Sequence, residues 1–97
     1  MTIVSITKSP RKDKRFRVTL NDGRRFDFGL IDGSTYIDHH DITKRNNYRA
    51  RPIANVKERN LIKQYIPSPA LFSYYLLWGN STDLNKNIQL LNKIISK

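Results

Sequence analysis

The sequence predicts an α+β fold, in which an N-terminal three-stranded antiparallel β-meander is followed by three or four short α-helices packed on one face. Apolar and polar residues alternate within residues 15–28, and helix start and stop signals fill residues 38–97. A length of 97 residues supports one domain. We therefore expect a single small basic domain covering 1–97, with the meander in 1–29 and the helical part in 38–97.

Two segments with clear alternation, 15–20 and 24–28, predict half-buried strands. The three residues between them end in Gly23. A two-residue turn would place apolar side chains opposite charged ones. A three-residue loop with Gly23 in the left-handed region instead pairs Val18 with Phe26. We therefore expect the three-residue loop.

The same register sets Arg17 opposite Asp27, which is a favourable cross-strand pair. The β-rich segment 3–7 predicts a first strand, and residues 8–14, which contain Pro10, predict an exposed basic loop. A three-stranded sheet with one apolar face needs a cover, because a small sheet is not stable alone. The C-terminal half is expected to supply it.

Caps and prolines divide the C-terminal half into helices. Asp38 is expected to cap a mostly polar helix, about residues 39–51, which Pro52 closes. A helix that is polar on nearly every side is usually marginal or held by a partner. Asn55 is expected to begin a second helix, which stops before Pro67.

Ser68 and Pro69 are an N-cap followed by proline in the first turn, so they predict a third helix. Its body, residues 71–78, is apolar around most of its circumference and is either buried on several sides or shared with a partner. Ser81 or Thr82 is expected to cap a last, amphipathic helix.

The charge of the chain is strongly positive, with 18 Lys and Arg against 8 Asp and Glu, or +10. Such a charge attracts nucleic acid, anionic lipid or an acidic protein surface. It is concentrated in residues 8–25 and 44–59, which are either solvated faces or docking surfaces. The absence of cysteine excludes disulfides and thiolate metal sites. No signal peptide and no membrane span are expected, so we expect a soluble protein inside the cell or packaged from it.

Neither metal binding nor catalysis is favoured by the titratable residues. Asp38-His39-His40-Asp41 has ligand-type side chains, but adjacent histidines on a helix point about 100° apart and no further His or Cys completes a site. Capping by Asp38 and packing by one histidine is the expected outcome. Two histidines and one glutamate show no spacing of a catalytic site, so no enzyme, cofactor or metal is expected.

Basic and aromatic residues point to docking instead, because aromatic residues and arginine dominate protein interfaces. Tyr75 and Trp78 are expected to anchor in an apolar pocket of a partner, although the aromatic residues would in part form the core. The same basic residues would neutralise phosphates if the partner were nucleic acid. The expected basic surface consists of Arg17, Arg24, Arg25, Lys44, Arg45, Arg49 and Arg51.

Residues 27–88 resemble a family of small basic proteins of no assigned function from nucleocytoplasmic large DNA viruses of algae and amoebae. The matching residues are Asp27-Phe28-Gly29, Tyr36, His39-x-Asp41, Arg45, Tyr48, Arg51, Phe72-Ser73, Leu76-Leu77-Trp78, Leu84 and Ile88. Pro52 departs from the pattern, which has histidine there, and this weakens any shared histidine chemistry.

The resemblance implies a viral origin and a place in the virion or in the viral factory of the host cytoplasm. We expect a non-enzymatic virion component, a minor capsid or capsid-associated protein that cements larger subunits such as the major capsid protein. The alternative is a nucleic-acid-binding protein of the viral core or factory.

Overall fold

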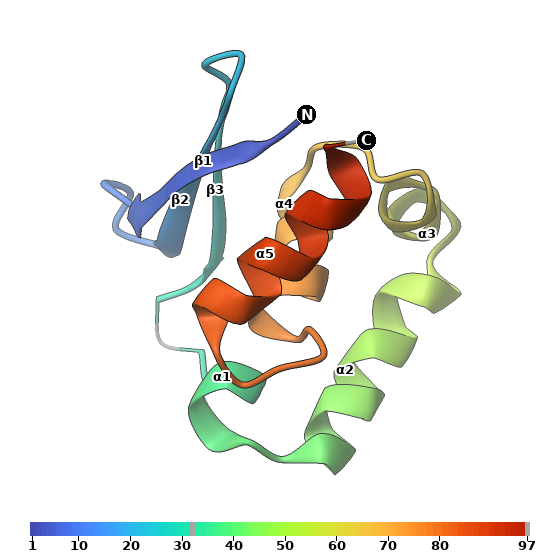
Figure 1. The fold of residues 1–97 in the computed structure, drawn as a ribbon. Coiled ribbons are helices and arrows are strands. Elements are labelled where there is room, and N and C mark those ends of the chain that lie inside the picture. The colour runs from blue at the N-terminus through green and yellow to red at the C-terminus, as the bar shows by residue number, and fades with distance from the viewer. Residues whose placement is uncertain (32, 97) are drawn as a thin grey trace.

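The fold was obtained as a computed structural model that describes residues 1–31 and 33–96 (Figure 1). It begins with a three-stranded antiparallel sheet in the order β1-β2-β3, and helices follow the sheet in the chain. This is the α+β fold that the sequence predicts. The strands are β1 (Ile3–Lys8), β2 (Lys14–Leu20) and β3 (Arg25–Leu30).

The β2–β3 hairpin has the predicted register. Val18 faces Phe26 and Arg17 faces Asp27, while Gly23 has a φ of +90°. The backbone N–H of Gly23 donates to the carbonyl of Leu20 over 3.0 Å. The three-residue loop is therefore confirmed, and it puts the apolar side chains of both strands on the face that the helices cover.

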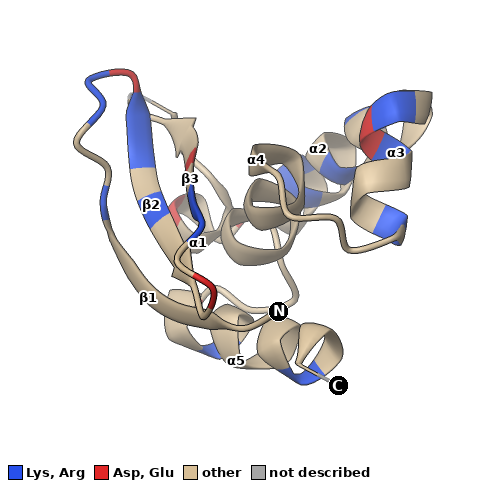
Figure 2. Cartoon of the chain, turned by 90° about the horizontal axis from the view of Figure 1, so that it is seen from above, with Lys and Arg blue, Asp and Glu red and all other residues tan. Residues whose placement is uncertain are grey.

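The helical part contains five α-helices and one π-helical turn among the described residues. They are α1 (Tyr36–His39), α2 (Ile42–Ala54), α3 (Val56–Lys63), α4 (Pro69–Phe72), the π-helical turn η1 (Ser73–Leu77) and α5 (Leu84–Ile95). In Figures 1 and 2, α4 lies between the sheet and the α2–α3 pair, and it packs against both β3 and α3. None of the described helices has the length and apolar character needed to cross a membrane.

The helix predicted for residues 39–51 is in fact two helices. Thr35 caps α1, and Asp38 completes its capping box, so the expectation that Asp38 caps the longer helix is wrong. His40 adopts a left-handed conformation and ends α1. Asp41 then caps α2 by accepting hydrogen bonds from the backbone N–H groups of Thr43 and Lys44.

Pro52 lies inside α2, although the sequence predicts that it closes the helix. Proline removes one intrahelical hydrogen bond, but its ring is buried here, and that burial offsets the lost bond near the end of the helix. The helix continues to Ala54, and the side chain of Asn55 caps α3 as predicted.

The last two helix starts differ in how well they were predicted. Ser68 accepts a hydrogen bond from the N–H of Leu71 and caps α4, as expected. Asp83, and not Ser81 or Thr82, caps α5. The hydroxyl of Ser81 instead accepts a hydrogen bond from the backbone N–H of Asp83, before the helix begins.

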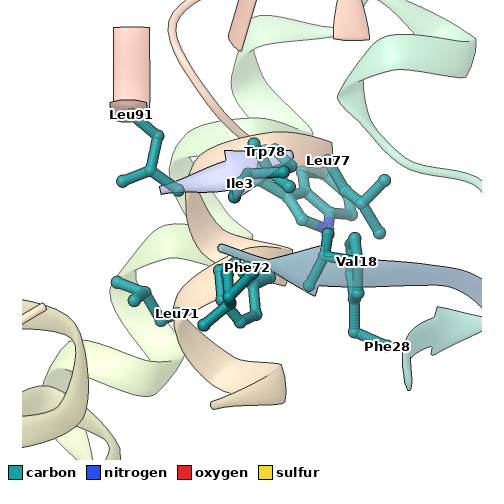
Figure 3. Close-up of a cluster of buried hydrophobic side chains, with 10 residues drawn as sticks. Ile3, Val18, Phe28, Leu71, Phe72, Leu77, Trp78 and Leu91 are labelled. Carbon is teal, nitrogen blue, oxygen red and sulfur yellow. The ribbon is translucent and has the colours of Figure 1, made fainter. Parts of the chain in front are cut away.

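The core lies between the sheet and the helical segment of residues 71–78 (Figure 3). Ten apolar residues form its buried cluster: Ile3, Val18, Leu20, Phe28, Leu71, Phe72, Leu76, Leu77, Trp78 and Leu91. Five of them come from residues 71–78, which explains why this segment is apolar around most of its circumference.

Candidate docking surface

The acidic side chains are largely used within the fold. Four aspartates form ion pairs with arginines of the sheet and its loops: Asp13 with Arg11, Asp22 with Arg24, Asp27 with Arg17, and Asp38 with Arg15. Asp41 and Asp83 cap helices. These ion pairs therefore offset half of the eight basic residues that lie within residues 8–25.

The basic residues of α2 and α3 are not offset in this way. Four lie on α2 and three on α3, against the single acid Glu58 (Figure 2). Among the described residues, none of the seven stands within ion-pair distance of a carboxylate. This helix pair thus carries the largest group of unpaired basic residues in the described chain, and we call it the α2–α3 basic surface: Lys44, Arg45, Arg49, Arg51, Lys57, Arg59 and Lys63.

The predicted basic surface divides into two regions. Its three sheet residues, Arg17, Arg24 and Arg25, lie on the opposite side of α4 from its four α2 residues (Figure 2). Lys44 and Arg51 are exposed and lie seven residues apart, so they share one face of α2. Of the basic residues predicted from the sequence, only the four of α2 therefore belong to the α2–α3 basic surface.

Arg17 is engaged by its neighbour across the hairpin. Its Nε donates to Asp27 Oδ1 over 2.9 Å, and its terminal nitrogen donates to Oδ2 over 3.1 Å. These hydrogen bonds lower the pKa of Asp27, and the Ser9 hydroxyl, which also donates to Asp27, lowers it further. Arg17 holds the hairpin together and has little left to offer a partner.

Arg45 and Arg49 lie on the inner side of α2, toward η1 and the loop that follows it. Arg45 Nε donates to the carbonyl of Gly79 over 2.7 Å, and a terminal nitrogen donates to Asn80 Oδ1 over 2.8 Å. The Cζ of Arg49 lies 4.1 Å from the ring centroid of Tyr74. These contacts connect α2 to the core segment.

Trp78 is not a surface anchor in this structure, which corrects the sequence-based expectation. It is 8% exposed, and its ring stacks on Tyr48 with centroids 4.2 Å apart and an interplanar angle of 8°. His39 packs against it with centroids 5.4 Å apart. The apolar segment meets the sheet, α2 and α5 at once, so its tryptophan is largely enclosed within the fold.

Tyr75 remains half-buried and belongs to a group of tyrosines. Its ring stacks on Tyr65 with centroids 5.5 Å apart, and it meets Tyr74 edge-on at 5.0 Å. Burial raises the pKa of Tyr75, and the hydrogen bond to the Tyr65 hydroxyl adds to the effect. We call Tyr65, Tyr74 and Tyr75 the tyrosine cluster.

Tyr65 holds its place in the cluster at a conformational cost. Its φ is +52°, a region that bulky residues rarely occupy and that glycine usually fills at the end of a helix. Strain of this kind persists where the surrounding structure requires it, and such sites are often functional. Ile66, which follows it, is 39% exposed and extends the apolar surface beside the ring.

The structure also has a cleft of about 290 Å³ between the end of β3 and the helices. Leu77 and Trp78 line its apolar side, and Tyr48 and Ser73 line it with hydroxyls that lie 3.1 Å apart and share a hydrogen bond. Lys14 reaches it from β2. Sequence reasoning did not find this cleft, because its walls come from segments far apart in the chain.

The histidines do not gather with other metal ligands. Within the described part of the chain, no group of three His, Cys, Asp or Glu residues lies close enough to hold a metal ion. His39 Nδ1 accepts a hydrogen bond from the backbone N–H of Asp41 over 2.9 Å, and its Nε2 is buried. His39 therefore packs from the end of α1 against Trp78 of the core.

One family model matches the chain, over residues 4–52, and its description is "Family of unknown function (DUF5754)". The match runs from β1 to the last turn of α2 and includes half of the residues. No curated protein and no solved structure matches the chain.

Proposed function

Because the chain belongs to the DUF5754 family, whose description names no activity, we propose its function from the geometry of its surface. The protein is a non-enzymatic virion component, a minor capsid or capsid-associated protein that cements larger subunits. It docks on an acidic protein surface through the α2–α3 basic surface and the tyrosine cluster. The uncompensated charge of α2 and α3, next to these tyrosines, is the observation that carries the proposal.

The charge supports docking in two ways. A surface with one sign of charge accelerates encounter with a partner of the opposite sign and disfavours wrong partners. Lys44 and Arg51 are exposed on α2, and Lys57 and Lys63 are exposed on α3, so they are accessible to an acidic partner. The α2–α3 basic surface would thus determine orientation and rate of association.

The tyrosine cluster supports the same proposal through its chemistry. Tyrosine and arginine are enriched among the residues that contribute most to binding energy, particularly where they are already half-desolvated. Tyr74 and Tyr75 are held by each other and by Arg49, so little conformational entropy is lost when a partner covers them. The cluster takes over the anchoring role that Trp78 cannot have.

The virion part of the proposal rests on the resemblance of residues 27–88 to small basic proteins of nucleocytoplasmic large DNA viruses. A protein of that group made in the viral factory would meet the major capsid protein in large excess. A small basic subunit is suited to bridging such large subunits, because its charge attracts it to acidic surfaces on them.

Nucleic-acid binding is a second candidate, and one observation favours it. The outer face of α2 exposes Lys44, Asn47 and Arg51 at spacings of three and four residues. Lysine and arginine contact phosphates, and arginine and asparagine also contact base edges. The partner in this case would be DNA of the viral core or factory.

The experiment that tests the proposal separates purified virions into shell and core fractions and quantifies the protein in each by mass spectrometry. A fixed ratio to the major capsid protein in the shell is the expected result. Release from the core by salt or nuclease would make DNA binding the function. Absence from both fractions would refute a virion role.

Charge-reversal variants locate the docking surface. Lys44→Glu with Arg51→Glu should weaken binding to the isolated shell fraction at least about tenfold, since each lost charge contact contributes of the order of 1 kcal/mol or more. Lys8→Glu with Lys12→Glu makes the same change in net charge at exposed positions in and after β1. This control pair should retain most of the binding, and equal losses in both pairs would reject a specific surface on α2.

A further inference from the structure

Arg45 and Arg49 lie one turn apart on the inner side of α2, and each guanidinium rests on a tyrosine ring. The Cζ of Arg49 is 4.1 Å from the centroid of Tyr74, and the Cζ of Arg45 is 5.6 Å from the centroid of Tyr36. Within residues 1–31 and 33–96, neither arginine forms an ion pair. Two half-buried cations are thus held near each other by aromatic rings and backbone, without a carboxylate.

Both arginines keep N–H donors that the fold does not use. Arg45 donates only to neutral oxygens, those of Gly79, Asn80 and Asn46, at 2.7, 2.8 and 3.2 Å. A guanidinium has five N–H donors, and the Nε of Arg49 is buried with no acceptor among the described residues. Buried N–H donors in proteins rarely lack an acceptor. Where one does, the unpaired donor needs an explanation.

The electrostatics of Arg45 and Arg49 also indicate that these two cations lack a counter-charge. Burial lowers the pKa of Arg45, and the positive charge of Arg49 lowers it further. On the sheet, by contrast, the half-buried arginines are compensated, Arg15 by Asp38 and Arg17 by Asp27. If residue 49 served only to pack against Tyr74, an uncharged side chain would be more favourable there, because it would avoid the desolvation of a second cation.

We propose that Arg45 and Arg49 form a binding site for a phosphate group, carried by the free ion or by a phosphomonoester. Such a group has a charge of about −1.5 to −2 near pH 7 and three or more acceptor oxygens. One phosphate therefore offsets both guanidinium charges and accepts hydrogen bonds from both. The planar fork of arginine is suited to this ligand, and the rings of Tyr36 and Tyr74 hold the two forks in position. The site does not depend on the docking function.

The test titrates the full-length protein with inorganic phosphate at pH 7 while chloride keeps the ionic strength constant. The side-chain Nε–Hε resonances of ¹⁵N-labelled arginine report on each residue separately. Saturable shifts of Arg45 and Arg49, with one dissociation constant, are the expected result. Shifts that grow linearly without saturation, or that are equally large at Arg51, would overturn the proposal.

Two variants of α2 make the test specific. Arg49→Gln should weaken phosphate binding about tenfold or more, because a hydrogen bond to a charged group contributes about 1.5–3 kcal/mol. Arg51→Gln removes the same charge from the exposed face of the same helix and should change the dissociation constant less than about twofold. Equal losses in both variants would mean that only the net charge attracts phosphate, and the site would be rejected.

Two further measurements cover the fold and the source of the phosphate. Arg49→Lys keeps the charge and loses the fork, so it should bind more weakly than the wild type while the fluorescence of the single tryptophan, Trp78, stays unchanged. A short phosphoserine peptide and its unphosphorylated form are titrated in parallel. Phosphate-dependent binding of the peptide assigns the site to phosphomonoesters, whereas binding of inorganic phosphate alone assigns it to the free ion.

Discussion

Replacement of Asn87 by leucine should lower the free energy of unfolding by about 3 kcal/mol, although the two side chains have the same branched skeleton. Asn87 is 1% exposed and connects α5 to the chain that follows η1. Its Nδ2 donates to the carbonyls of Leu76 and Ser81 over 3.0 and 2.8 Å, and its Oδ1 accepts from the N–H of Ser81 over 3.0 Å. Leucine would leave these three backbone groups without a partner.

The magnitude follows from the burial of each group. A buried polar group without a partner costs about 1–3 kcal/mol, so the carbonyl of Leu76, which lies in the core, contributes about 2 kcal/mol. Ser81 is half-buried, and water satisfies its two groups in part, so they add about 1 kcal/mol each. The additional apolar surface of leucine returns about 1 kcal/mol. Together these contributions lower the free energy of unfolding of the Asn87→Leu variant by about 3 kcal/mol.

Urea denaturation at pH 7, followed by the fluorescence of Trp78, measures this loss. Asn85→Leu is the matched control, because Asn85 is exposed on the same helix and its replacement should change the stability by less than about 0.5 kcal/mol. Asn87→Asp keeps the shape but removes both Nδ2 donors, so it should also destabilise, and less so at acid pH where the carboxyl regains one donor. A loss below about 1 kcal/mol for Asn87→Leu would refute the importance of these hydrogen bonds.

Two further changes test other parts of the fold. Asp38→Asn should lower the free energy of unfolding by about 1–2 kcal/mol at pH 7, because it weakens the bidentate pair with Arg15 and the capping box of Thr35. The loss is no larger because both interactions are only partly shielded from water. The hydrogen bonds from Arg15 hold the pKa of Asp38 well below its unfolded value of about 3.9, so this stability is complete above that pH and is lost as the pH falls toward the folded pKa. Urea titrations should therefore show the gap to the wild type narrowing below about pH 4, and a gap that stays constant down to pH 2 would contradict the assignment. Gly79→Ala should lower the free energy of unfolding by more than about 2 kcal/mol, because its Cβ would clash with the carbonyl oxygen of Tyr75. A melting temperature equal to that of the wild type would show that the chain at Gly79 adapts freely.

The sheet could be predicted in detail because its register depends on neighbours in the sequence. The alternation of apolar residues allows two registers for the hairpin, and only the three-residue loop ending in Gly23 keeps Val18 opposite Phe26. Caps such as Asn55 and Ser68 were predicted for the same reason, since a cap acts on N–H groups two or three residues away.

The candidate site could be predicted only in part, because burial of a side chain depends on segments distant in sequence. Residues 71–78 are recognisable as buried on several sides, but nothing local shows whether Trp78 meets a partner or, as the structure has it, Tyr48. The same holds for Arg49, whose ring partner Tyr74 lies 25 positions further along the chain. The start of α2 was misplaced because Asp38 is held by Arg15 of the sheet, which local patterns do not reveal.

The positions of the ion pairs indicate which side of the protein faces an anionic partner. Four pairs, Arg11–Asp13, Arg15–Asp38, Arg17–Asp27 and Arg24–Asp22, lie on or beside the sheet, so much of the positive charge there is offset within a few ångströms. Salt screens what remains beyond about 8–10 Å, so a partner responds mainly to charge that is uncompensated nearby. The basic residues of α2 and α3 have no such pairs, and in Figure 2 they lie apart from the sheet, with α4 between. In the proposed function, the helix pair would therefore be the side that approaches an anionic partner first.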